Sequence, residues 1–185
     1  MSSPVSSTNS FRRLWRRFRR SRRGSAALEF ALVAPVFFAL LFAIIETALM
    51  FFASQVLETI TQDSARMILT GQAQKATSVN TPDLFRTTYI CSRIPALFDC
   101  SKIYVDVQSY SSFSSVTIAN QIDASKTFIN NMQYNPGNPG DVVVVRLFYQ
   151  WPIFVTGLGY NITNLTGSMR LLTASAAFKN EPYGP

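Results

Sequence analysis

The stretch that decides the fold is Phe30-Ala-Leu-Val-Ala-Pro-Val-Phe-Phe-Ala-Leu-Leu-Phe-Ala-Ile-Ile45, which is apolar throughout when Pro35 is counted as apolar. With residues 25–28 before it and 48–53 after it, the run approaches thirty residues and is interrupted only by Glu29, Glu46 and Thr47. About twenty residues suffice to cross the hydrocarbon core of a bilayer. The sequence therefore predicts a membrane-spanning helix, in which a proline such as Pro35 is tolerated with a mild kink.

The residues before this run carry the charge of the protein. The formal net charge is +7, but eight arginines lie between Arg12 and Arg23, and no acidic residue occurs among residues 1–23. The remaining chain holds nine basic and ten acidic residues. Positive charge flanking a span stays in the cytoplasm, so we expect a cytoplasmic N-terminus and an exported C-terminal part. A cleaved secretory signal is not favoured, because the apolar region is too long and lacks an Ala-x-Ala-like site.

Within this tail, the segment from Phe11 to Arg20 places Phe11, Trp15 and Phe18 on one helical face and arginines around the rest. Such a basic amphipathic segment is suited to an anionic membrane surface, and we expect membrane lipid as its partner. Removal of the tail with a leader is an alternative, and nucleic-acid binding is a weaker one. Glu46 is expected near the outer interface, with its carboxylate snorkelling toward water.

The helix is predicted to continue beyond the membrane. Apolar or small residues recur at spacings of three and four up to Ile68, and polar residues fill the positions between them. Thr70-Gly71 offers a C-terminal stop. A helix over residues 25–70 would be about 70 Å long.

The rest of the chain predicts an α+β fold with a small antiparallel sheet. Residues 72–80 are expected to form a linker, and Thr81-Pro82-Asp83 is typical of a helix start. Three strands are predicted at 103–108, 141–151 and 169–178, the first with Ile103, Val105 and Val107 inward, and the residues at 111–140 are expected to form loops. We expect three regions: a basic cytoplasmic leader (1–24), the transmembrane and amphipathic helix (25–70) and a periplasmic α+β domain (71–185).

Little in the sequence points to catalysis or to a metal site. Histidine is absent, which removes the commonest general base and metal ligand. Cys91 and Cys100 are the two cysteines, and in an exported domain such a pair is predicted to form a disulfide. No phosphate-binding loop or nucleophile elbow is present in the sequence. We therefore expect no enzyme activity, no cofactor and no metal.

Residues 22–30, Arg-Arg-Gly-Ser-Ala-Ala-Leu-Glu-Phe, resemble the processing site of type IV prepilin-like proteins. The wider run over 24–35, and the C-terminal run over 170–182, resemble TadE-like proteins of the tight-adherence pilus system. In that family a membrane-embedded peptidase cuts after the glycine, and the fifth residue after the cut is a glutamate, often followed by an aromatic residue. The resemblance thus implies a cut between Gly24 and Ser25, with Glu29 as the acid and Phe30 as the aromatic.

The resemblance also implies partners. In related filaments the acid is thought to neutralise the new N-terminal amine of a neighbouring subunit. Ala27/Ala31 and Ala39/Ala43 are small residues four apart, which lets another helix approach closely. Expected partners are the prepilin peptidase, the inner-membrane pilus platform and other pilin-like subunits. No nucleic-acid partner is expected.

The predicted function is that of a pilin-like subunit or assembly factor of a Tad-type surface pilus, anchored in the bacterial inner membrane. Pilin-like subunits, assembly factors and unprocessed relatives share this opening sequence. The alternative is a membrane-anchored periplasmic binding or sensing domain that keeps its N-terminus. The N-terminal residue of the protein recovered from membranes separates the two hypotheses.

Overall fold

The computed structural model describes residues 23–76, 78–94, 96–156 and 160–182. The arginine-rich tail and its predicted amphipathic segment, Phe11 to Arg20, lie outside these residues. The chain divides into two compact units, residues 1–44 and 45–185. The first described helix, α2 (Arg23–Leu69), belongs in part to each unit.

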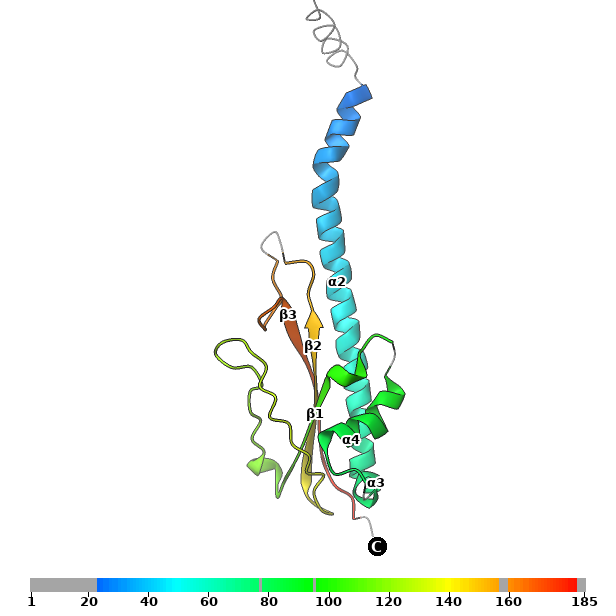
Figure 1. The fold of residues 1–185 in the computed structure, drawn as a ribbon, viewed down its shortest axis with the longest axis vertical. Helices are drawn as coiled ribbons and strands as arrows, with labels where there is room; N and C mark the ends of the chain where they lie inside the picture. Colours follow the sequence, from blue (N-terminus) through cyan, green and yellow to red (C-terminus); the bar gives the residue numbers. More distant parts are fainter. Residues whose placement is uncertain (1–22, 77, 95, 157–159, 183–185) are drawn as a thin grey trace, which may run out of the picture. The chain divides into compact units, whose positions relative to one another are not determined.

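The second unit contains the sheet and several short helices, shown in Figure 1. These helices are α3 (Gln72–Lys75), α4 (Pro82–Phe85), the π-helical turn η1 (Arg86–Ile90) and the 3-10 turns η2 (Cys91–Arg93), η3 (Cys100–Lys102) and η4 (Phe113–Ser115). The strands are β1 (Ile103–Tyr110), β2 (Val142–Pro152) and β3 (Met169–Lys179). The long apolar helix and the small sheet confirm the predicted α+β class.

Helix α2 ends where its sequence predicts. Gly71 adopts a left-handed backbone conformation with φ of 75°, which glycine reaches without a steric penalty. Its N–H donates to the carbonyl of Ile68 at 2.9 Å. The predicted linker that follows is partly wrong, because α3 forms one further helical turn there and buries Ala73. The predicted start at Thr81 is confirmed, since its side chain accepts a hydrogen bond from the Leu84 N–H.

The three strands form one antiparallel sheet in the order β1-β2-β3. The centre of the sheet aligns Asp106 with Arg146 on β2, and Arg146 in turn with Ser175 on β3. The outer edge of β1 is covered by the later segment around Tyr134. There the Val107 N–H donates to the Gln133 carbonyl, and the Asn135 N–H donates to the Val107 carbonyl, at 2.9 and 2.8 Å.

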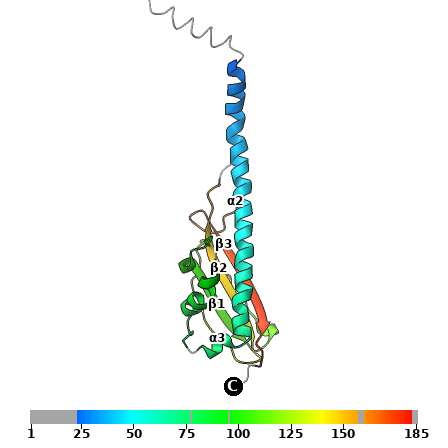
Figure 2. The same ribbon diagram turned by 90° about the vertical axis from the view of Figure 1, so that its right-hand side faces the viewer.

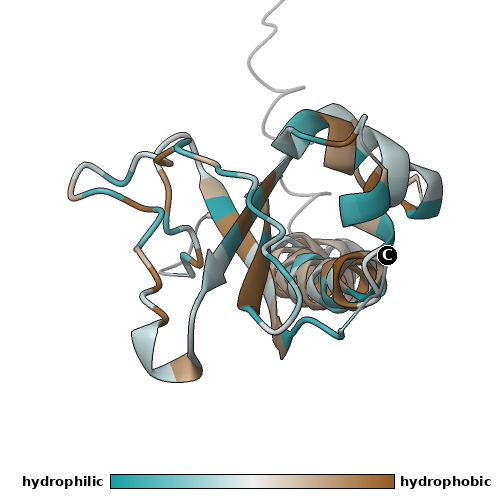
Figure 3. Cartoon of the chain, turned by 90° about the horizontal axis from the view of Figure 1, so that it is seen from below, coloured by the Kyte–Doolittle hydropathy of each residue, from teal (hydrophilic) through white to brown (hydrophobic). Residues whose placement is uncertain are grey.

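One face of the sheet packs on the part of α2 that follows residue 45. Figure 2 shows this stretch of helix running along the sheet. Figure 3, coloured by hydropathy and seen from below, shows hydrophobic colour on strand residues next to the helix. Leu57 and Ile68 are fully buried there together with the predicted inward residues Ile103, Val105 and Val107. The amphipathic stripe on the second half of α2 therefore supplies the core that a three-stranded sheet needs for stability.

The opposite face of the sheet is covered as well, by the irregular chain between η4 and β2. This segment lies on the side of the sheet away from α2 in Figure 1. Phe148, Leu165 and Leu171 form a second buried cluster, against which Ile122, Phe128 and Met132 pack. Consequently β2 is buried on both faces over its first eight residues. The Pro/Gly/Asn-rich chain around residues 111–140, predicted as loops, is irregular but forms a packed layer.

Candidate functional site

The residues of the predicted processing motif all lie on the first turns of α2. Gly24, Ser25, Glu29 and Phe30 fall within one continuous helix that begins at Arg23. Positions 25 and 29 are four apart and so share one face of this helix. Glu29 is exposed, and the Phe30 side chain is 68% exposed.

Gly24 occupies a position that does not require glycine within the described chain. A Cβ atom placed on Gly24 would meet no other atom within 4 Å. Its backbone is helical, and glycine in a helix costs about 1 kcal/mol relative to alanine. The packing and the backbone conformation of the described residues thus give no reason for glycine at position 24.

The small residues of the first unit form two separate pairs. Ala27 and Ala31 are exposed, and Ala39 and Ala43 are half-buried. At about 100° per residue, the first pair is turned by about 120° around the helix from the second. The four alanines therefore do not form one stripe, and they offer close approach to helices on two different sides.

Glu46 is held differently from the prediction. Its carboxylate accepts hydrogen bonds from two consecutive backbone N–H groups, those of Phe154 and Val155, the second at 3.0 Å. Glu46 is only 8% exposed. The next residue, Thr47, shares a hydrogen bond with the Tyr160 hydroxyl. The carboxylate does not snorkel to water, because the chain after β2 supplies donors that satisfy it.

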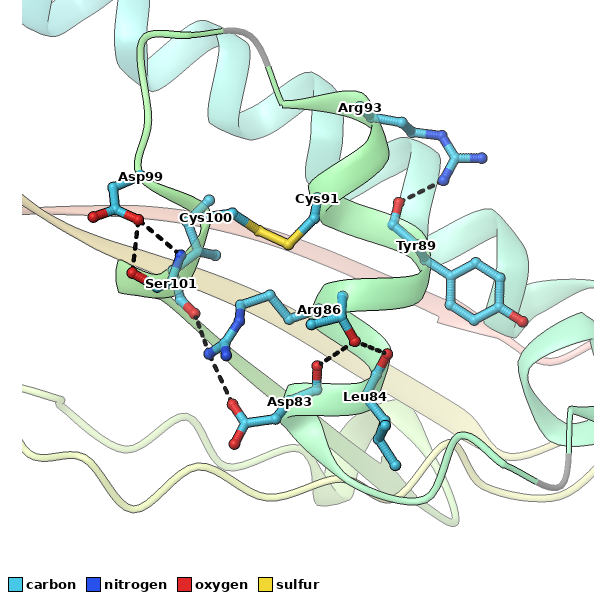
Figure 4. Close-up of a disulfide and its surroundings, with 11 residues drawn as sticks. Asp83, Leu84, Arg86, Tyr89, Cys91, Arg93, Asp99, Cys100 and Ser101 are labelled. Atoms are coloured by element: carbon cyan, nitrogen blue, oxygen red, sulfur yellow. Dashed lines mark hydrogen bonds and ion pairs between the residues drawn. A yellow bond between two sulfur atoms is a disulfide. The ribbon is translucent and has the colours of Figure 1, made fainter.

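Cys91 and Cys100 form the predicted disulfide, shown in Figure 4. It joins η2 to η3, the turn that leads directly into β1. The surrounding polar contacts are local. The Ser101 hydroxyl and backbone N–H both donate to Asp99 and lower the pKa of its carboxyl group. A loop of this size closed by a disulfide stabilises a fold by about 2–3 kcal/mol.

A buried ion pair beneath the irregular layer was not anticipated from the sequence. The Arg146 guanidinium donates to Asp106 at 2.7 Å, with the two side chains 6% and 2% exposed. Asp106 also accepts from the Gln133 N–H, and Arg146 donates to the Ala119 carbonyl. An arginine inside a run of valines and leucine was the available signal. Every partner in this pair comes from the sheet or its covering layer, which indicates a structural role.

Metal binding finds no support in this part of the chain. Within the described ranges, no group of three or more His, Cys, Asp or Glu side chains is placed to hold an ion.

The described residues contain one helix, within Ala26–Leu69, that is long and apolar enough to cross a membrane.

Comparison with known proteins gives a family match over most of α2. Residues 24–66 match the family model described as TadE-like protein. No curated protein matches the chain, and no solved structure does. The TadE-like family consists of structural and assembly proteins of pili, so the match supports a protein associated with a Tad pilus. The segment 24–66 is therefore TadE-like, which confirms the family resemblance predicted from its sequence.

Proposed function

We propose that this protein is a pilin-like subunit or assembly factor of a Tad-type surface pilus. In this proposal α2 anchors it in the bacterial inner membrane, with the N-terminus in the cytoplasm and the sheet domain in the periplasm. A prepilin peptidase cuts the chain between Gly24 and Ser25. The observation that carries the proposal is the motif from Gly24 to Phe30, which directly precedes the apolar run within the TadE-like segment.

The surroundings of Gly24 support a role for an external partner. Glycine at this helical position is unfavourable for the chain and is not required by any contact with described residues. A peptidase that draws the backbone into its cleft does favour glycine, because a side chain would obstruct close approach. Recognition by the peptidase thus explains a residue that the fold itself does not.

The surface of the helix supports insertion in a membrane. Apart from the buried Met50, the large apolar side chains from Leu28 to Phe52 are exposed to between 37% and 74% of their area. A soluble protein rarely exposes so much contiguous apolar surface. The disulfide between Cys91 and Cys100 fits export of the second unit, because such bonds persist in oxidising compartments such as the periplasm.

N-terminal sequencing of the protein from piliated cells tests the proposal. The mature chain is expected to begin at Ser25. Gly24→Val should leave a full-length precursor in the membrane and abolish piliation, because the β-branched side chain obstructs the scissile bond. Ala31→Val, a similar enlargement beyond the cut, should be processed normally. If the wild-type protein begins at Met1 or Ser2, an anchored periplasmic binding or sensing domain becomes the better account.

A further inference from the structure

The second unit begins at Ile45, within α2, and carries an exposed apolar patch close to this point. Ile45, Leu49, Phe51 and Phe52 on α2 are 45%, 48%, 62% and 60% exposed. Phe154, just after β2, is 84% exposed, which makes it the most exposed large apolar side chain of the described residues. Clustered apolar exposure of this kind marks an interaction surface.

The backbone at Phe154 is hydrogen-bonded to Glu46, within the stretch of α2 that carries the other exposed side chains. The Phe154 N–H and that of Val155 donate to the two carboxylate oxygens of Glu46. One residue earlier, the Ile153 N–H donates to the Ser168 carbonyl at 2.8 Å, and the Ile153 side chain is buried. Figure 1 shows this chain leaving the tip of β2 beside α2. Three consecutive backbone N–H groups, from Ile153 to Val155, are thus hydrogen-bonded, while the Phe154 side chain is exposed.

The height of this contact on the helix matches the end of a membrane span. Twenty residues are about enough to cross the hydrocarbon core, and twenty counted from Leu28 end at Thr47. Glu46 and Thr47 therefore lie at the edge of the hydrocarbon if α2 spans a membrane. A carboxylate at that depth is costly unless it is bonded, and the two N–H groups meet this need. Tyrosine, here Tyr160 bonded to Thr47, is enriched at the same depth in membrane proteins.

We propose that the segment Ile153–Thr156 lies in the lipid interface at the C-terminal end of the span, with the Phe154 side chain in contact with acyl chains. The inference rests on the proposed function, since it requires α2 to span the membrane. Glu46 is then a positioning residue that ties the sheet domain to the bilayer surface. The occupant is lipid because the exposed side chains of this patch on α2 follow the apolar run of the span directly in sequence.

The test uses nitroxide labels on single-cysteine variants of the full chain in vesicles of phosphatidylethanolamine and phosphatidylglycerol. Because Cys91 and Cys100 are paired, a thiol-specific label reaches only the introduced cysteine. Phe154→Cys reports on the proposed contact, and Phe38→Cys reports on the span itself. Phe113→Cys is the matched control, since Phe113 is 60% exposed but lies on η4, away from Glu46 in sequence and contact.

The readout is the accessibility of each label to oxygen, which concentrates in lipid, relative to a water-soluble nickel chelate. The label at position 154 should give an oxygen-to-nickel ratio several-fold above that at 113, and the label at 38 should give the highest ratio. A ratio at 154 equal to that at 113, with 38 still in lipid, overturns the inference and leaves the span intact. Low accessibility at 154 to both reagents also overturns it, in favour of contact with another protein copy. A label at position 38 that is accessible to the nickel chelate overturns both this inference and the proposed membrane span.

A second comparison tests the role of Glu46. Glu46→Ala removes both acceptor oxygens, so the label at 154 should lose its oxygen preference and become more mobile. Glu58→Ala changes another glutamate of α2, whose recorded partner is the exposed Gln62, and should leave the label at 154 unchanged. Unaltered mobility at position 113 in both variants shows that the sheet remains folded. If Glu46→Ala leaves the ratio at 154 unchanged, Glu46 does not position the segment.

Discussion

In the proposed function, Glu29 is the residue whose chemistry links cutting to assembly. It is exposed on α2, on the face that it shares with position 25. Glu29→Ala does not obstruct the scissile bond, so we expect cutting to survive. The new amine would lose its acidic partner between packed helices, where an unpaired charge is costly. We therefore expect mature protein in the membrane and little or none in sheared pili, as measured by immunoblot.

Glu58→Ala serves as the control for this prediction, because it removes a glutamate from the same helix outside the apolar run. It should be cut and assembled as the wild type is. Wild-type levels of Glu29→Ala protein in pili would show that the acid is dispensable for assembly. An accumulating Glu29→Ala precursor would instead place the acid in recognition by the peptidase.

Tyr134 makes the stability of the sheet domain fall at alkaline pH. Burial raises the pKa of its hydroxyl well above the ordinary value, and the neighbouring Tyr89 adds to the shift. The unfolded chain releases this proton near pH 10, whereas the folded protein retains it. The contribution of Tyr134 is therefore fully present below about pH 10 and is lost as pH rises toward the folded pKa.

Tyr134→Phe should remove this loss. The ring keeps its packing against Phe85, whose centroid lies 5.5 Å away, so we expect little change in the free energy of unfolding at pH 7. Above pH 10 the variant should become more stable than the wild type. Denaturant unfolding in detergent from pH 8 to 11 measures the difference, and both proteins carry the same lysines and arginines. Parallel pH profiles for the two proteins would contradict the prediction.

Among the elements, α2 changes its role along its length, and two of its leucines test this. Leu57 is fully buried against the sheet, whereas Leu49 is 48% exposed. Leu57→Ala should lower the free energy of unfolding of the sheet domain by about 2–5 kcal/mol, because it leaves a cavity in the core. Leu49→Ala should change it by less than about 1 kcal/mol. Denaturant unfolding in detergent, followed by the fluorescence of Trp151, gives both values. Equal losses of stability in the two variants would contradict the difference in role between the two parts of α2.

The elements with local signals are those that the sequence predicts well. Gly71 marks the end of α2, Thr81 caps α4, and the valine-rich run gives β2, because each signal depends on neighbouring residues. The covering of the second sheet face was not predicted, because it depends on contacts between distant residues. Asp106 meets its partners Gln133 and Arg146 27 and 40 residues further along the chain. Such pairs depend on strand register and on loop path, which local pattern does not specify.

The distinction between local signals and contacts of distant residues also separates the processing motif from the Glu46 contact. The motif from Gly24 to Phe30 is contiguous, so it is visible in the sequence alone. The partners of Glu46 lie 108 and 109 residues away from it, at Phe154 and Val155. The sequence therefore places Glu46 at the end of the span but predicts a carboxylate turned to water. Only the packed fold shows which backbone groups bind it.

At the scale of the whole molecule, the charge distribution predicts the orientation in the membrane. Eight arginines precede the span, and the remaining chain has a net charge of −1. Arginine and lysine close to a span resist translocation, so the N-terminus should stay in the cytoplasm. An alkaline phosphatase fused after Pro185, which is active only outside the cytoplasm, should therefore be active in cells.

Replacing the eight arginines with glutamine should lower this activity and give a mixed orientation, because the difference in positive charge across the span disappears. The control replaces four exposed lysines of the sheet domain with glutamine, at Lys75, Lys102, Lys126 and Lys179. These residues lie beyond the span, so their loss removes charge without removing the cytoplasmic signal, and the activity should not fall. If the wild-type fusion is inactive and a cytoplasmic reporter at the same site is active, the C-terminus lies in the cytoplasm and the predicted orientation is wrong. The disulfide between Cys91 and Cys100 would then face a reducing compartment, and the proposed path to a surface pilus would fail with it.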